Sequence, residues 1–221
     1  MSTVDVFWLD PATVAEAYLG VLNETERERM AALRRHEDRL RFGAAAALLR
    51  TVVGAETGTP PERVAVHRSC PDCQRPHGRP TLPGLGLHAS VSHSGARVAV
   101  ALTRVGPVGV DVEEPRDVLF AELSDRVLGE GERAHDAGAF YRYWTRKESA
   151  VKATGDGLRV SLSGVRVSPP DEPARLLGYP GRPDLAAWMA DLAPGAGHVG
   201  AVTVLTVEPV TVREHRLAGL P

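Results

Sequence analysis

The sequence predicts an α+β fold with two tightly packed halves that meet near Gly106. Residues 42–53, rich in Ala and Leu, and residues 132–153 have the composition of long helices. Residues 4–9 alternate in hydrophobicity, and Val-rich runs farther along the chain favour antiparallel strands. Because no repeat and no long linker separates these elements, we expect them to pack together rather than as independent domains.

The first half is expected to begin with a strand and to continue mainly as helices. The strand at 4–9 is followed by an Asp-Pro pair, which ends it and opens a helix through residues 18–22. Asn23 and Glu26 have the spacing of a capping box, so a second helix should begin there. The chain then continues as a charged helical surface at 24–41, a core helix at 42–53 and a short strand at 64–67.

The second half is expected to contain a hairpin, two helices and further strands. The hairpin joins strands 96–103 and 108–113 through residues 104–107. A helix follows at 119–128, and the long helix at 132–153 should stop at Gly155 and Gly157. The remaining strands are expected at 164–167, around Trp188 and at 199–207.

Composition excludes several classes of protein. The chain has 221 residues and a net charge of −2, so it carries neither a basic nucleic-acid footprint nor a polybasic membrane patch. It has no apolar run of membrane-spanning length, and its N-terminus lacks the basic region of a signal peptide. We therefore expect a cytoplasmic protein that binds neither nucleic acid nor membrane.

Three carboxylates form a candidate metal site. Asp111 and Glu113 are two residues apart on a strand, so both project from one face, opposite three core valines. Glu148 would add a third oxygen ligand from the long helix, where helical spacing places it on one face with Trp144 and Lys152. Three carboxylates with open positions suit Mg²⁺, which also binds substrate phosphates.

Each feature also has a simpler interpretation. Asp111 and Glu113 could be a hydrated strand end, and Glu148 with Lys152 a surface ion pair. The Ser-rich segment at 90–95 could bind phosphate through hydroxyls and backbone N–H groups, or it could be an ordinary turn. Lys147 and Lys152 are the only lysines in a chain that otherwise uses Arg, which favours a requirement for compact positive charges on this helix.

Cys70 and Cys73, in a Cys-Pro-Asp-Cys spacing, are the only cysteines. With His77, and with His67 nearby, they could bind Zn²⁺. A single Cys pair with loosely spaced histidines is weak evidence, so a plain surface loop remains the alternative.

Two motifs at a characteristic separation resemble those of a known family. Val108-Gly-Val-Asp-Val-Glu113 and Trp144-Thr-Arg-Lys-Glu-Ser-Ala-Val-Lys152 together resemble the signature of the 4′-phosphopantetheinyl transferases, in particular the monomeric Sfp-type branch. Further similar segments are Gly78-Arg-Pro80, Ser90–Gly95 with its Ser-His-Ser-Gly element, Glu37-Asp-Arg-Leu-Arg-Phe42 and Gly155-Asp-Gly-Leu158. The resemblance covers about residues 22–165.

The resemblance implies an α+β fold with a pseudo-twofold arrangement of two similar halves and coenzyme A between them. The N-terminal half, 1–106, would bind the 3′-phosphate and adenine, and the C-terminal half, 107–221, would hold the metal and the catalytic groups. The implied reaction moves 4′-phosphopantetheine from coenzyme A to a serine of an apo acyl or peptidyl carrier protein and releases adenosine 3′,5′-bisphosphate. The carrier would belong to a polyketide, peptide or fatty acid synthase.

The resemblance also implies roles for individual residues. Asp111, Glu113 and Glu148 would hold Mg²⁺, or Mn²⁺ in its place, against the pyrophosphate. Glu148 would also be the base, directly or through a metal-bound water, and Lys152 would contact a phosphate and steady the departing charge.

Five further residues would bind the substrate's phosphates and adenine. Ser92 and His93 would bind the pyrophosphate or the 3′-phosphate, and Arg29, Arg41 and Arg79 would gather around the 3′-phosphate and adenine.

The sequence departs from the family pattern at two positions. Arg79 stands where Lys is common, and Glu26 stands where some relatives have a phosphate-binding Lys, a role that Arg27 could take. Glu132 matches an acidic family position without an evident role. A carrier-binding module without activity and a Mg²⁺-dependent phosphohydrolase remain as rival interpretations.

Overall fold

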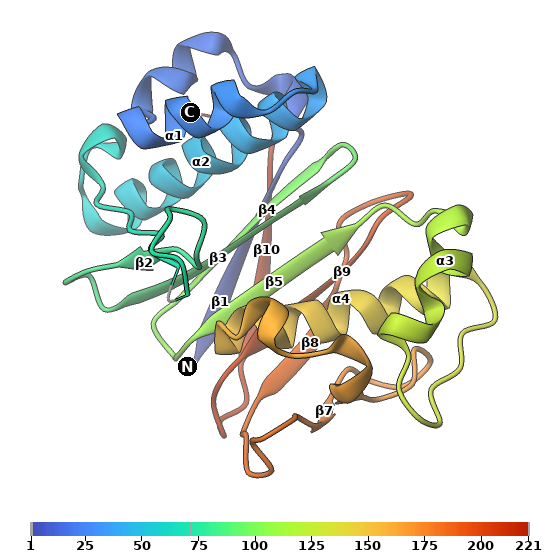
Figure 1. The fold of residues 1–221 in the computed structure, drawn as a ribbon. Coiled ribbons are helices and arrows are strands. Elements are labelled where there is room, and N and C mark those ends of the chain that lie inside the picture. The colour runs from blue at the N-terminus through green and yellow to red at the C-terminus, as the bar shows by residue number, and fades with distance from the viewer. Residues whose placement is uncertain (1, 71, 221) are drawn as a thin grey trace.

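The computed structural model describes residues 2–70 and 72–220 and confirms an α+β fold with small sheets packed against helices. A five-stranded sheet has the order β10-β1-β4-β3-β2, and a three-stranded sheet has the order β5-β9-β8 (Figure 1). The strands of the first sheet are β1 (Thr3–Leu9), β2 (Thr81–Leu82), β3 (Leu87–Ser94), β4 (Arg97–Thr103) and β10 (Thr211–Leu217). Those of the second are β5 (Val108–Glu113), β8 (Trp188–Leu192) and β9 (Val199–Val204), and β6 (Arg166–Val167) pairs with β7 (Leu176–Gly178).

Helices cover both sheets. The α-helices are α1 (Glu24–Ala32), α2 (His36–Thr57), α3 (Asp117–Val127) and α4 (Ala137–Thr154). The 3₁₀ turns are η1 (Pro11–Thr13), η2 (Glu16–Val21), η3 (Pro61–Arg63), η4 (Gly157–Arg159) and η5 (Leu162–Gly164). Helix α2 packs against β3 and β4, and α4 packs against β5 and β9 (Figure 1). None of the helices in the described ranges is long and apolar enough to cross a bilayer.

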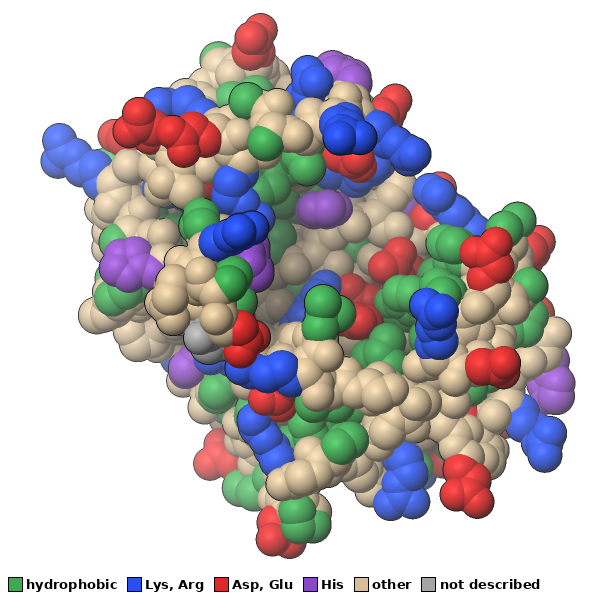
Figure 2. All heavy atoms as spheres, in the orientation of Figure 1, with side chains coloured by type: hydrophobic (Ala, Val, Ile, Leu, Met, Phe, Trp, Pro, Cys, Tyr) green, Lys and Arg blue, Asp and Glu red, His purple; other side chains and the backbone are tan. Residues whose placement is uncertain are grey.

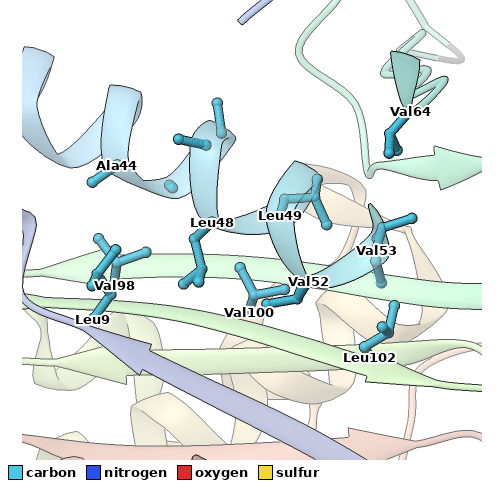
Figure 3. Packing of buried hydrophobic residues seen from close by; sticks show 14 of the residues in the cluster. Leu9, Ala44, Leu48, Leu49, Val52, Val53, Val64, Val98, Val100 and Leu102 are labelled. Carbon is cyan, nitrogen blue, oxygen red and sulfur yellow. The ribbon is translucent and has the colours of Figure 1, made fainter. Parts of the chain in front are cut away.

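The predicted core helix lies within α2 and packs on alternate residues of β4. Leu48, Leu49 and Val52 are buried against Val100 and Leu102 (Figure 3). Full burial of side chains of this size stabilises a fold by about 1.5–3 kcal/mol each. The period-2 pattern of β4 therefore fixes which face receives α2.

The side chains on the opposite face of β4 are small, and the second sheet packs against them. Ala99 and Ala101 contact a cluster that contains Val108, Val110 and Val112 of β5, all fully buried. The alternation predicted for 108–113 is therefore confirmed, and its polar face is left to turn toward β3 and α4.

The predicted hairpin between 96–103 and 108–113 is wrong. Both strands form, but β4 is already paired on one edge with β1 and on the other with β3. Strand β5 instead pairs with β9, and residues 104–107 carry the chain from one sheet to the other. At this crossing Leu205 N donates to Pro107 O at 2.9 Å.

Several predicted boundaries also shift. The helix expected through 18–22 is 3₁₀ (η2), and the strand expected at 64–67 is a single bridge between His67 and Thr81. The long helix begins only at Ala137, where Asp136 caps it, and residues 132–136 precede it as a loop. The strand expected at 199–207 ends at Val204, and β6 retains only the last two residues of 164–167.

Strand β10 was not predicted, and it joins the two ends of the described chain. It pairs in parallel with β1 along its whole length, from Thr3 with Thr211 to Leu9 with Leu217. The first sheet thus contains residues from both halves of the sequence.

Candidate active site

A cleft separates the part of the molecule built on α1, α2 and β3 from the part built on β5 and α4. It consists of cavities of about 360 Å³ and about 640 Å³ that share Arg68, Val91, Glu148 and Lys152. Figure 2 shows the hollow between these two parts, with acidic and basic side chains along it. A polar cleft with charges of both signs is suited to an anionic ligand together with a cation.

Asp111 of β5 is the centre of the polar network in this cleft. The residue is nearly inaccessible to solvent, at 2 % exposure. Lys152 Nζ donates to Asp111 Oδ1 at 2.6 Å and to Ser92 Oγ at 2.9 Å, and Ser92 Oγ donates to the same carboxylate oxygen at 2.8 Å. Three side chains from β3, β5 and α4 are thereby held in one arrangement.

Alternate serines of β3 connect the two sheets. Their hydroxyls accept backbone N–H groups of the second sheet's edge strand and the residue after it: Val110 N at 3.0 Å from Ser90 Oγ, Val112 N at 3.4 Å from Ser92 Oγ, and Glu114 N at 3.1 Å from Ser94 Oγ. Ser94 Oγ also donates to Glu113 Oε2 at 2.8 Å. The expected Ser/Gly turn is therefore mostly strand, and its hydroxyls satisfy backbone donors that sheet pairing leaves open.

Helix α4 brings the remaining predicted groups to the cleft. Trp144, Glu148 and Lys152 all line the smaller cavity, as their spacing on one helical face predicts. The helix approaches β5 closely because Gly109 has no side chain: a Cβ there would lie 1.9 Å from Ser149 O.

The two lysines of α4 have separate surroundings. Lys147 points away from the cleft, is fully buried, and donates to Val127 O at 2.7 Å and to Glu132. Glu132 also accepts Gly129 N at 2.7 Å. Glu132, whose role the sequence did not reveal, thus joins Lys147 in a buried ion pair that holds the segment between α3 and α4.

Asp111, Glu113 and Glu148 together carry more negative charge than their ion pairs within the protein compensate. Burial, followed by the nearby charge of Asp111, raises the pKa of Glu113 to about 7. Burial and Asp111 also raise the pKa of Glu148. Among the described residues, the only direct ion pair to any of these three carboxylates is the one between the Lys152 ammonium and Asp111. Such shifts are typical of sites that receive a cation or move a proton.

These side chains fit a divalent cation bound in an open site. Asp111 Oδ2 is one of two buried side-chain atoms in the described ranges that have no hydrogen-bond partner. Oxygen atoms from the three carboxylates do not all lie within 4.8 Å of one another, so the described groups do not form a closed metal cage. Mg²⁺ commonly keeps several waters and binds through few carboxylates and substrate phosphates, so an open set suits it.

The opposite wall of the smaller cavity is basic. Arg29 and Arg68 line it, and Glu26, which also lines it, is neutralised by Arg50 at 2.8 Å. Burial, then the charge of Arg29, lowers the pKa of Arg68 to about 10. The Arg68 guanidinium has no hydrogen bond or ion pair within the described residues, so it is available to an anion. No local sequence pattern singled out Arg68, because only the tertiary fold places it beside Arg29.

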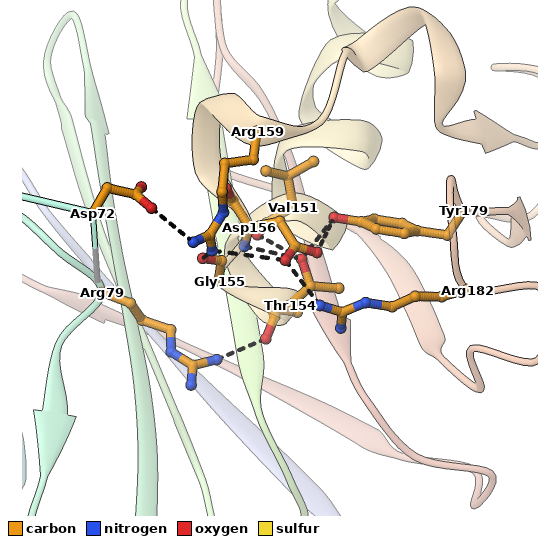
Figure 4. Close-up of polar contacts among 10 residues, drawn as sticks. Asp72, Arg79, Val151, Thr154, Gly155, Asp156, Arg159, Tyr179 and Arg182 are labelled. Atoms are coloured by element: carbon orange, nitrogen blue, oxygen red, sulfur yellow. Dashed lines mark hydrogen bonds and ion pairs between the residues drawn. The ribbon is translucent and has the colours of Figure 1, made fainter. Parts of the chain in front are cut away.

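The other predicted phosphate-binding residues lie around the cleft. His93 lines the smaller cavity, and its pKa is lowered by desolvation and then by Lys152 and Arg41. Arg41 donates to Asp38 at 2.7 Å and to Gly95 O at 3.4 Å, in the turn after β3. Arg79 lines the larger cavity and donates to Ala153 O at 2.8 Å, near the end of α4 (Figure 4).

Comparison with known proteins finds one family model and several related sequences. Residues 107–203, which include β5 and α4, match the model of the 4′-phosphopantetheinyl transferase superfamily. The chain is 30% identical to the 4′-phosphopantetheinyl transferase HetI of Nostoc sp. over 183 residues. This aligned region covers 76% of this chain and 72% of that protein.

Two further similarities are shorter. One is to the 4′-phosphopantetheinyl transferase AcpT of Salmonella typhi, 38% identical over 89 residues, 35% of this chain and 46% of that protein. The other is to the 4′-phosphopantetheinyl transferase Sfp of Bacillus subtilis, 30% identical over 100 residues, 41% of this chain and 44% of that protein. The chain belongs to the 4′-phosphopantetheinyl transferase superfamily.

Proposed function

We propose that the protein transfers 4′-phosphopantetheine from coenzyme A to a serine of an apo carrier protein. The observation that carries this proposal is the network in which Asp111, with Glu113 and Glu148 near it, is paired with Lys152 at 2.6 Å beside a basic cavity wall. That arrangement offers a cation site and a positioned ammonium group on one side and arginines for a terminal phosphate on the other. We place the protein in the monomeric, Sfp-type branch, acting on acyl or peptidyl carriers of polyketide, peptide or fatty acid synthases.

Asp111, Glu113 and Glu148 would hold Mg²⁺ or Mn²⁺. The unpartnered Oδ2 of Asp111 and the raised pKa values of the two glutamates support this assignment. Bound there, the metal would supply positive charge to the diphosphate oxygens, whose negative charge grows as the phosphoryl group is transferred.

The protein's own side chains account for the remaining needs of the reaction. Lys152, fixed by Asp111 and Ser92, faces the cleft and stabilises the negative charge that develops on the departing adenosine 3′,5′-bisphosphate. Glu148, whose pKa is raised by burial, is suited to accept the proton of the carrier serine as its oxygen attacks phosphorus. The P–O bond of the diphosphate breaks, and the electron pair leaves with the bisphosphate.

The basic wall would recognise the 3′-phosphate end of coenzyme A. Arg29 lies over the ring of Phe42, with its guanidinium carbon 5.0 Å from the ring centroid. Arg68 lies close enough to Arg29 for their charges to interact. Two neighbouring guanidinium groups repel each other, and a phosphate between them would relieve that cost. Arg41, Arg79 and His93 lie nearby and would complete the contacts to phosphate and adenine.

Mass spectrometry of carrier proteins tests the proposed activity. Incubation with coenzyme A and Mg²⁺ should add one phosphopantetheine group to an apo carrier, and omission of the metal should prevent it. Asp111→Asn should lower the activity by roughly 10²-fold or more, because a neutral amide replaces a charged ligand and the anionic partner of Lys152.

The same assay separates the rival functions. Breakdown of coenzyme A without any carrier would identify a phosphohydrolase instead. A panel of carriers from fatty acid, polyketide and peptide synthases tests the other rival. If the protein bound a carrier but modified none of them, it would be a binding module, and the proposed reaction would be wrong.

A further inference from the structure

The segment between η3 and β2 brings two thiols and an imidazole together at the edge of the cleft. One ligand atom each from Cys70, Cys73 and His77 lies within 4.8 Å of the other two. Cys73 Sγ and His77 Nε2 are 2.9 Å apart. In a tetrahedral zinc site, Zn–S bonds near 2.3 Å and Zn–N bonds near 2.0 Å place ligand atoms roughly 3.5 Å apart, so small side-chain movements suffice to receive the ion.

The backbone of this segment is arranged around the first thiol. The N–H groups of Cys73 and Asp72 point toward the sulfur of Cys70, an arrangement that stabilises a thiolate. Gln74 N donates to Cys70 O, and Cys70 N donates to Arg75 O, both at 2.9 Å. Gln74 has φ of 60°, and among the non-glycine residues of the described ranges it is the only one with positive φ.

A left-handed conformation at a residue other than Gly costs of order 1 kcal/mol, which the hydrogen bonds of this turn, including that from Ser69 Oγ to Gln74 Oε1 at 3.1 Å, help to offset. The segment has little core of its own, since Cys73 and His77 are exposed and only Cys70 is buried. Small loops without enough apolar burial are commonly stabilised by a metal or a disulfide.

The donor set favours a metal over a disulfide. Cys70 and Cys73 are free thiols in this structure. A disulfide would engage these two side chains and give no reason for His77 to approach Cys73. Two sulfurs and one imidazole form a soft donor set, which selects Zn²⁺ over Mg²⁺.

The same segment connects the two sides of the cleft. Asp72 forms an ion pair with Arg159 at 3.1 Å, and Arg79 donates to Ala153 O (Figure 4). Pro76 O accepts from Arg29, and Gly78 N donates to Arg68 O at 2.7 Å. A rigid turn at 70–77 would therefore hold both the cleft-lining arginines and the contact with the C-terminal part.

We infer that Cys70, Cys73 and His77 bind one Zn²⁺, with water as the fourth ligand, and that this ion fixes the segment 68–79 at the edge of the cleft. The site is separate from the carboxylates on β5 and α4, and the inference does not depend on the proposed transfer activity.

Elemental analysis of the full-length protein, after incubation with equimolar Zn²⁺ under reducing conditions and desalting, tests this site. One Zn²⁺ per chain is expected for the wild type and for two controls, His67→Asn and Asp111→Asn. Cys73→Ser and His77→Asn should each lose most of the bound zinc. If either variant fails to fold, the other one carries the comparison.

Cobalt substitution supplies a spectroscopic measurement of the same ligands. The Co²⁺ protein should show thiolate-to-metal charge transfer and the visible bands of tetrahedral coordination, and the charge-transfer intensity should fall in Cys73→Ser. Hydrogen exchange in peptides from residues 68–79 should be faster in that variant than in wild type with zinc.

Four results would overturn the inference. They are wild-type protein that retains no zinc, zinc retained equally by Cys73→Ser and His77→Asn, zinc lost in Asp111→Asn, or a Cys70–Cys73 disulfide that persists under reducing conditions.

Discussion

At the scale of single residues, Asp111 combines a structural and a chemical role in one carboxylate. Its Oδ1 accepts from Lys152 and Ser92, while its buried Oδ2 has no partner within the described residues. Leaving a buried charged oxygen unsatisfied normally costs at least 1–3 kcal/mol. The protein retains that cost at the position where a cation is expected, which agrees with a site organised for binding rather than for stability alone.

Arg68 should determine how well the protein distinguishes coenzyme A from its 3′-dephospho form. Arg68→Gln removes a guanidinium that has no partner within the described residues, so folding should change little. We expect KM for coenzyme A to rise about tenfold or more, because a charge-assisted contact to phosphate is lost, while KM for dephospho-coenzyme A stays nearly the same. Steady-state kinetics with both substrates measures this.

The control for Arg68 is Arg63→Gln. Arg63 is exposed on η3 and lines neither cavity of the cleft. Equal loss with both substrates in Arg68→Gln, or the same loss in Arg63→Gln, would contradict the assignment of Arg68 to the 3′-phosphate.

Glu113 should make the metal-free protein less stable as the pH rises. Its folded-state pKa of about 7 lies above the ordinary value of 4.5, so the folded protein keeps a proton that the unfolded chain loses. The resulting stability is complete below pH 4.5 and is lost as the pH rises through 7, a difference on the order of 3 kcal/mol.

Thermal unfolding in chelator from pH 5.5 to 8.5 measures this effect. Over this pH range the Tm of wild type should fall by several degrees more than that of Glu113→Gln, which cannot ionise at this position. Excess Mg²⁺ at pH 8.5 should restore most of the Tm that wild type loses. If the Tm values of the two proteins changed with pH in parallel, the folded-state pKa of Glu113 would not be raised, and the prediction would be wrong.

At the scale of elements, the site depends on how closely α4 approaches β5. Gly109 allows this contact, since an added Cβ would meet Ser149 O at 1.9 Å and Ala153 N at 2.5 Å. On the edge of β5 that does not pair with β9, the serine hydroxyls of β3 accept hydrogen bonds from Val110 N and Val112 N. Strand β5 is therefore fixed from both sides, and its carboxylates are fixed with it.

Gly109→Ala should destabilise the protein by about 3 kcal/mol or more, because backbone atoms of α4 would have to move. Activity should also fall in whatever fraction remains folded, since α4 carries Glu148 and Lys152. Gly20→Ala is the matched control, because nothing lies within 4 Å of its added Cβ. Denaturant unfolding compares the two, and a similar midpoint for both would disprove the close-contact argument.

At the scale of the whole molecule, the two halves of the sequence are interleaved. Strand β10, near the end of the chain, pairs with β1 at its start. Trp8 Nε1 donates to Glu214 at 2.7 Å across this pair, and β5 buries its valines against β1 and β4. The cleft lies between parts that also share a core.

Separate fragments 1–106 and 107–221 should therefore fail to fold alone. The first lacks β10 and the strand that covers Ala99 and Ala101, and the second leaves β10 without a partner. Circular dichroism and NMR chemical-shift dispersion of each fragment test this. Cooperative unfolding of either fragment by itself would show that the halves are autonomous.

Much of this arrangement was accessible from the sequence, because it depends on local periodicity. The alternation around Asp111 and Glu113, the helical face of Glu148 and Lys152, and the Asn23 capping box all depend on spacing alone.

Features decided by distant partners were not accessible. The supposed hairpin failed because β1, a hundred residues earlier, occupies the edge that β5 would have used. Strand β10 carries few apolar residues and is recognised only by its pairing with β1, and Arg68 gains significance only when folding places it beside Arg29. Tertiary contacts of this kind leave little trace in a single sequence.

The most direct test of the account is anomalous diffraction from crystals grown with Mn²⁺ and coenzyme A. We predict a manganese peak within bonding distance of oxygens from Asp111, Glu113 and Glu148, with the diphosphate on its open side and Lys152 beside a phosphate. A peak away from these carboxylates, or coenzyme A bound with its diphosphate outside the cleft, would contradict it.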